Sequence, residues 1–147
     1  MAIEQLKTVL QVEQDKEDKL GIDLRQAQHH LIDNEQKLEG IQQYRLDYMK
    51  QLHYKAQQGI EGNFYNQYQA FMKKLDSASE QQINAVNTAK RVVEQRKELW
   101  LKQQQKRKAL EMLIEKHELA KQERLDKAEQ QMLDEIATNQ FIRNQKR

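Results

Sequence analysis

The sequence predicts an all-α protein, folded as a long antiparallel two-helix coiled-coil hairpin with arms of unequal length. Three observations lead to this fold class. The chain of 147 residues contains no proline and is rich in strong helix formers such as Gln, Glu, Lys and Leu. Apolar residues recur at 3-4 spacing through its first third, as they do in coiled coils. The spacing stops near Tyr54, before Gly59 and Gly62, and glycine supplies the positive-φ conformations that end helices.

The composition favours long helices over a compact domain. Charged residues make up 33% of the chain, apolar residues only 37%, and the mean hydropathy is −1.07. A large buried core is therefore not expected. Disorder is the competing interpretation for so polar a chain, but the helix-forming composition without proline argues against it. We expect one elongated coiled-coil domain over residues 1–147.

The first arm is expected at about residues 2–55. Eleven of the fifteen positions at strict 3-4 spacing from Ile3 to Leu52 are apolar. A seam sustained over seven heptads is typical of a coiled coil. The polar interruptions at Glu13, Glu17 and Asn34 should weaken the seam locally and help to fix its pairing.

The second arm is expected at about residues 63–140, after a hinge at 55–63 in which Asn63 is a candidate N-cap. Folding at this hinge pairs residue 48 with about residue 70, and residue 3 with about residue 115. Because the second arm is the longer one, an overhang of about residues 118–147 has no partner within the chain. Its exposed apolar side chains mark it as an interaction site.

The net charge is only +2, but the charged residues are distributed unevenly along the chain. Residues 11–39 carry eight acids against four bases, whereas residues 91–108 carry seven bases against two acids. The two regions either attract each other or face different partners. The basic run contains Trp100, which suggests nucleic-acid binding as one alternative. The favoured interpretation is a solvated helix face with Trp100 packed in the seam, and no nucleic-acid partner is expected.

Catalysis is not expected, because two long helices form no pocket with convergent groups. The chain has no cysteine and no glycine-rich phosphate loop or metal-binding motif, so we expect no enzyme activity, no cofactor and no metal site. The N-terminus lacks the pattern of a signal peptide, and no apolar run approaches the ~20 residues that span a bilayer. These features predict a soluble cytoplasmic protein. The four histidines are interpreted as surface or seam residues: His29, His30, His53 and His117.

Seven of the nine aromatic residues lie between Tyr44 and Phe71, on both sides of the two glycines. Two sets of four residues share the spacing i, i+4, i+7, i+11, and each forms one helix stripe. The sets are Lys37, Ile41, Tyr44 and Tyr48 on the first arm, and Phe71, Leu75, Ala78 and Gln82 on the second. One interpretation is an aromatic core that locks the turn. The other is an exposed interface, because Tyr is enriched at binding hot spots.

Three segments of the chain resemble the flagellar FliJ family. They are the hinge segment GIEGNFYNQYQAFMKKLDSA (59–78), the stretch from Trp100 to Leu110, and the tail EQQMLDEIATNQF (129–141). The second segment departs from the family's pattern at Gln103, where a basic residue is expected.

The resemblance implies a monomeric, non-enzymatic component of the flagellar type III protein export apparatus, at the cytoplasmic face of the inner membrane. The implied partners are the export ATPase FliI, the export gate protein FlhA and substrate chaperones, with the hairpin acting like the stalk of a rotary ATPase. The implied gate-binding residues are Ile41, Tyr44, Tyr48, Phe71, Leu75, Ala78 and Gln82. The implied contacts with the ATPase ring are Leu125, Ala128, Met132, Leu133 and Ile136. The alternative function is a generic cytoplasmic coiled-coil scaffold or tether that dimerises through both arms.

Overall fold

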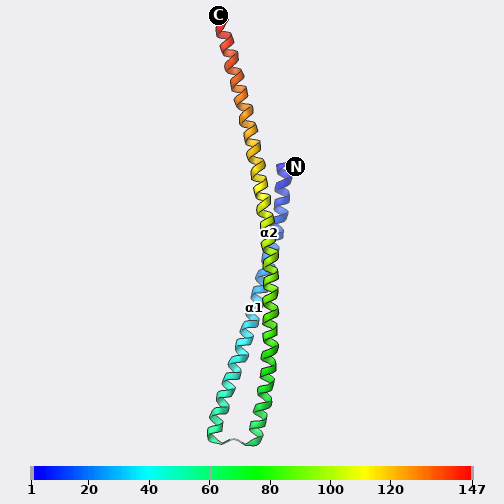
Figure 1. The fold of residues 1–147 in the computed structure, drawn as a ribbon, viewed down its shortest axis with the longest axis vertical. Helices are drawn as coiled ribbons and strands as arrows, with labels where there is room; N and C mark the ends of the chain where they lie inside the picture. The colour runs from blue at the N-terminus through cyan, green and yellow to red at the C-terminus, as the bar shows by residue number, and fades with distance from the viewer. Residues whose placement is uncertain (1, 60, 147) are drawn as a thin grey trace. The chain divides into compact units, whose positions relative to one another are not determined.

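The computed structural model describes residues 2–59 and 61–146, and these form two α-helices. Helix α1 runs over Ile3–Gln58 and helix α2 over Gly62–Gln145 (Figure 1). The helices contain 56 and 84 residues. The all-α helical hairpin with arms of unequal length is thus confirmed.

The connection between the helices is shorter than the predicted hinge, because the helix formers Ala56 to Gln58 continue α1. Gly59 then ends the helix with a φ of 93°, a value that other residues rarely adopt. Residue 60, inside the predicted hinge, lies outside the described residues. The first turn of α2 is also stabilised across the connection, since the Lys55 ammonium lies 4.3 Å from the centre of the Phe64 ring.

The proposed N-cap at Asn63 is wrong. The carbonyl of Glu61 accepts the first hydrogen bonds of α2, from the backbone amides of Phe64 at 3.1 Å and Tyr65 at 3.3 Å. Glu61 therefore occupies the capping position, and Asn63 lies within the first turn. The N-cap is defined by its backbone carbonyl, and every residue has one. A prediction based on the type of side chain therefore selected Asn63 instead of Glu61.

The chain divides into two compact units, each containing part of both helices. The hinge unit comprises residues 18–101, and the terminal unit comprises residues 2–17 and 102–146.

The hinge unit is closed mainly by apolar packing. Its buried apolar residues are Leu24, Tyr68, Val86 and Ala89. Trp100 packs closely on Gly21: a Cβ atom at Gly21 would lie 3.3 Å from the indole Nε1. The indole thus contacts the opposite helix, in agreement with the interpretation of Trp100 as a packed seam residue.

The hinge unit also contains one buried polar layer, at the predicted interruption Asn34. The Gln82 side-chain amide donates to both the backbone carbonyl and the side-chain Oδ1 of Asn34, at 2.9 Å each. Asn34 in turn donates to the backbone carbonyl of His30 at 2.8 Å. The interruption therefore has a specific partner on the opposite helix.

The terminal unit pairs the first turns of α1 with the middle of α2. Its buried apolar residues are Leu6 and Ile114, and the carboxylates Glu13 and Glu17 are buried beside them. An exposed ion pair joins Lys7 to Glu118 at 3.1 Å. After Glu118, every described residue of α2 is exposed, so this part of the helix is unpaired in the structure.

Candidate interaction surfaces

The structure brings the aromatic members of the two predicted stripes together. The ring centres of Tyr48 and Phe71 lie 4.5 Å apart, and those of Tyr48 and Tyr68 lie 5.2 Å apart with nearly parallel planes. Tyr44 contacts Phe71 edge-on at 5.9 Å. These contacts place residue 48 opposite residues 68–71, which confirms the pairing expected at the hinge end.

A groove of about 430 Å³ lies between the two stripes. Four of the seven predicted gate-binding residues line it: Ile41, Tyr44, Leu75 and Gln82. Of the other three, Tyr48 and Phe71 belong to the aromatic contacts, and Ala78 is exposed outside the groove.

Lys37 and Gly40 complete the groove, and sequence reasoning did not nominate Gly40. A Cβ atom added at Gly40 would meet nothing within 4 Å, so this position is open space. The sequence does contain an indication of this role, because Gly40 lies in the interior of a predicted helix and directly precedes the stripe residue Ile41. Such a glycine costs helix stability and often has another reason to be present.

The aromatic stretch contains both packed and exposed residues. Tyr68 is buried, and Tyr48 and Phe71 are half-buried, so these three pack the seam. Tyr44, Tyr54 and Tyr65 remain 47–63% exposed. The exposed tyrosines are available for contact with a partner, whereas the seam residues support them.

A second apolar depression, of about 610 Å³, lies beside the hinge. Leu46, Met49 and Tyr54 of α1 line part of it, and Tyr68 of α2 closes it. Sequence reasoning missed this surface apart from Tyr54. The sequence does indicate this surface, because the apolar residues Leu46 and Met49 each directly follow a seam position.

The five predicted ATPase contacts are all exposed on the unpaired part of α2. At about 100° per residue, Leu125, Ala128, Met132 and Ile136 share a face roughly 80° wide, and Leu133 lies beside it. The larger side chains of this set are 48–56% exposed. The overhang stripe, defined as these five residues, is therefore covered only by its own helix.

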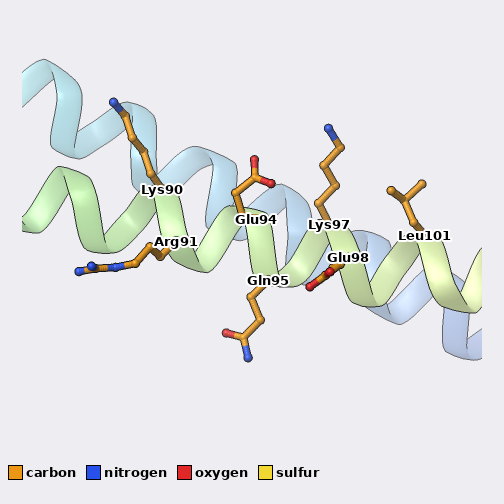
Figure 2. A pocket seen from close by; sticks show the side chains of 7 residues that line it. All are labelled: Lys90, Arg91, Glu94, Gln95, Lys97, Glu98 and Leu101. Atoms are coloured by element: carbon orange, nitrogen blue, oxygen red, sulfur yellow. The ribbon is translucent and has the colours of Figure 1, made fainter.

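The basic run does not form a convergent site. A depression of about 670 Å³ is lined by side chains from α2 alone. Figure 2 shows that these side chains point to different sides of that helix. Acids alternate with bases along it: Lys90, Arg91, Glu94, Lys97 and Glu98. Among the described residues, no cluster of His, Cys, Asp or Glu is arranged to hold a metal ion. A search of the described residues also finds no helix able to span a membrane.

The acidic and basic regions attract each other within each unit. In the hinge unit, Arg96 lies 3.6 Å from Asp23. In the terminal unit, Lys106 lies 3.7 Å from Glu13, and Arg107 forms an ion pair with Glu17. Hydrogen bonds from Arg107 to Glu17 and Glu111 raise the pKa of its guanidinium, which stays charged. Part of the basic run thus serves pairing of the helices.

Comparison with known proteins gives one family. Neither a search of curated proteins nor a search of solved structures returns a match. The family model described as "Flagellar FliJ protein" matches residues 1–146, almost the whole chain. The segments that carry the sequence resemblance all lie inside this range, and the protein belongs to the flagellar FliJ family.

Proposed function

We propose that the protein is a non-enzymatic linker of the flagellar type III export apparatus. In this proposal it joins the export ATPase ring to the export gate and to substrate chaperones, and it acts as a monomer. Membership of the FliJ family supports a role related to flagellar export. The protein would work at the cytoplasmic face of the inner membrane, held there by its partners.

The overhang stripe is the observation that carries the proposal. Its apolar side chains are half-exposed on a helix whose partner has ended. Exposed apolar surface of this kind marks interaction sites. We assign this stripe to the ATPase ring. The groove lined by Ile41, Tyr44, Leu75 and Gln82, together with the aromatic contacts beside it, is assigned to the gate.

The ATPase assignment is tested with Met132→Glu and Ile136→Glu in one chain. Charges on the stripe should weaken binding of the export ATPase at least about tenfold, because apolar contact is replaced by buried carboxylates. Titration calorimetry with the purified ATPase measures the affinity. The matched control is Lys127→Glu, which also makes the net charge more negative by two but lies on the side of the same helix away from all five stripe residues. Equal loss in both variants contradicts the assignment.

The gate assignment is tested with Tyr44→Ala and Phe71→Ala in one chain. Gate binding should fall while ATPase binding and helical circular dichroism remain. The control variant combines Tyr54→Ala with Tyr65→Ala, two exposed tyrosines outside the stripes. If helicity collapses in the first variant, the stripe is core and the gate assignment fails.

A generic coiled-coil tether is the second candidate, because the 3-4 spacing from Leu125 to Met132 also suits a second copy of the chain. Sedimentation velocity separates the two functions. A monomer of 17.6 kDa with a high frictional ratio supports the linker. A dimer that is lost with Met132→Glu and Ile136→Glu supports the tether.

A further inference from the structure

We infer that residues 3–17 of α1 form a strap that opens from α2 while the hinge unit stays closed, and that a polar latch holds it shut. The latch consists of Glu13 and Glu17 on the strap, and Gln103 and Arg107 on α2. This inference is independent of the export role, since it rests on the packing and the polar contacts within each unit.

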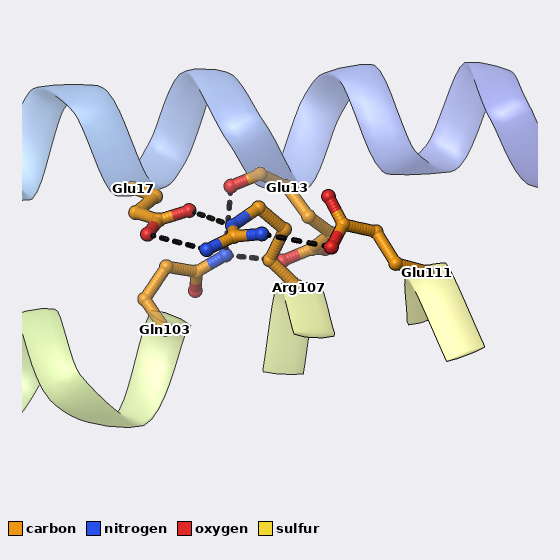
Figure 3. Close-up of polar contacts among 5 residues, drawn as sticks. All are labelled: Glu13, Glu17, Gln103, Arg107 and Glu111. Atoms are coloured by element: carbon orange, nitrogen blue, oxygen red, sulfur yellow. Dashed lines mark hydrogen bonds and ion pairs between the residues drawn. The ribbon is translucent and has the colours of Figure 1, made fainter. Parts of the chain in front are cut away.

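The latch residues reach across between the helices and leave no buried polar side-chain atom unpaired in the described chain (Figure 3). The Gln103 amide donates to the Glu13 carboxylate at 2.6 Å and to the Glu13 backbone carbonyl at 3.0 Å. Arg107 donates to Glu17 through both Nε and a terminal nitrogen, and its other terminal nitrogen donates to Glu111 at 2.9 Å. Four side chains thus close this part of the strap by hydrogen bonds and charge.

Apolar packing contributes less to the strap than to the hinge unit. Leu6 is the strap's only buried apolar residue among those described, and Ile114 is its buried counterpart on α2. Ile3 and Leu10 are half-buried. The α2 segment opposite, residues 102–108, is almost wholly polar. A segment with few buried apolar contacts has a low free energy of local opening.

The contact between Gln103 and Glu13 is made with an ionised carboxylate, which makes the latch sensitive to acid. The hydrogen bond from Gln103 lowers the pKa of Glu13, the charges of Lys106 and Lys16 lower it further, and burial opposes them. Because folding lowers this pKa, the stabilisation is present above the unfolded-state pKa and is lost as pH falls through the folded-state pKa. The groups facing the other carboxylate, Glu17, include Arg107, which also holds Glu111.

Opening of the strap changes the surface of α2. The 3-4 spacing of the α2 seam continues from Ile114 through Glu118 and Lys121 to Leu125. With the strap closed, Ile114 is buried, and the first exposed apolar residue of this seam is Leu125. With the strap open, Ile114 becomes accessible as well. The strap therefore controls how much of the α2 seam is accessible.

Thiol labelling tests the inference, because the chain has no cysteine of its own. Single substitutions Ile114→Cys and Val86→Cys place a thiol under the strap and in the hinge unit, at positions that are 6% and 5% exposed. Under native conditions, the thiol at position 114 should react with a maleimide at least about tenfold faster than the thiol at position 86.

The latch is then removed in each cysteine background with Arg107→Gln. Labelling at position 114 should rise about tenfold or more, and labelling at position 86 should stay within about twofold. The matched control is Lys108→Gln, which removes one exposed positive charge beside the latch and should change neither rate. If Arg107→Gln accelerates both sites equally, or accelerates neither, the strap does not open separately.

Hydrogen exchange of the unmodified chain gives a second test that does not depend on any variant. Protection factors, corrected for the intrinsic effect of pH, are compared at pH 7 and pH 4. Amides of residues 6–17 should lose protection at pH 4 by about two- to fourfold relative to amides of residues 24–50. Parallel loss in the two segments overturns the inference.

Discussion

The hinge unit and the terminal unit close the same two helices by different chemistry. In the hinge unit, Tyr48, Tyr68 and Phe71 stack at the turn, and Leu24 with Val86 is buried further along. In the terminal unit, the buried glutamates Glu13 and Glu17 occupy positions of the seam that are apolar elsewhere.

The difference indicates how one coiled coil can contain a unit that stays closed and a unit whose closure depends on solution conditions. Apolar packing is non-directional and involves no group that titrates. Carboxylate–guanidinium and carboxylate–amide contacts depend on charge and on exact partners. The proposed attachment at the hinge end thus has a rigid support, whereas the overhang adjoins a segment that responds to conditions.

The comparison is tested most strongly by truncating one buried leucine of α1 in each unit. Leu24→Ala should lower the free energy of unfolding by about 2–4 kcal/mol, as other buried Leu→Ala substitutions do. Leu6→Ala should move the same transition by less than about 1 kcal/mol, because it acts on local opening of the strap. Urea titration followed by fluorescence of Trp100 reports on the hinge unit, which contains the chain's single tryptophan.

The matched pair works because both side chains are leucines on the same helix, and both are less than 10% exposed. Equal shifts of the Trp100 transition in the two variants would mean that the chain unfolds as one cooperative unit. The proposed contrast between the two units would then be lost.

The helices and their pairing were accessible from sequence because they depend on local spacing. The 3-4 seam from Ile3 to Leu52 defines one arm, and the break at Gly59 fixes which residues meet at the turn. Tyr48 accordingly lies against Tyr68 and Phe71. Capping was not accessible in this way, since the group that begins α2 is the carbonyl of Glu61 rather than a side chain.

Contacts across the helices were only partly accessible. Opposite charge in the two arms was visible, but the sequence does not show that Glu17 meets Arg107 or that Glu13 meets Gln103. Those pairs depend on how each helix is rotated about its own axis, because this rotation decides which side chains face the other helix. The groove beside Gly40 depends on it as well. The predicted gate and ATPase contacts came from family resemblance, and they stay predictions.

A medium effect is expected at the polar layer of the hinge unit. Asn34→Leu alone removes the side-chain acceptor of the Gln82 amide, which keeps only the backbone carbonyl of residue 34, and should cost about 1–1.5 kcal/mol. Asn34→Leu with Gln82→Leu replaces both partners by apolar groups and should restore or exceed the original stability. Urea titration measures both changes.

The double variant also tests whether the layer selects the intramolecular hairpin. A single buried polar residue often specifies register and oligomeric state in coiled coils. Sedimentation velocity should therefore detect dimers or mixed species for the double variant but not for the original chain. A double variant that stays monomeric shows that pairing is specified elsewhere, for example by the latch residues.

The smallest effects are expected at two glycines of the hinge unit, and they should have opposite signs. Gly59→Ala places a Cβ atom in a backbone conformation with φ of 93° and should cost about 1 kcal/mol or slightly more. Gly40→Ala should stabilise the chain by about 0.5–1 kcal/mol, because Gly40 lies inside α1 and an added Cβ meets nothing within 4 Å. Thermal unfolding followed by circular dichroism resolves both shifts.

The Gly40 variant separates stability from binding. The added methyl group enters the groove that Ile41, Tyr44 and Leu75 line, so a gate that uses this groove should bind the more stable variant less well. A variant that gains both stability and gate affinity would show that the open space at Gly40 is not part of the contact. Loss of gate affinity together with a gain in stability would show that the open space at Gly40 serves binding, and this single substitution measures both quantities in the same chain.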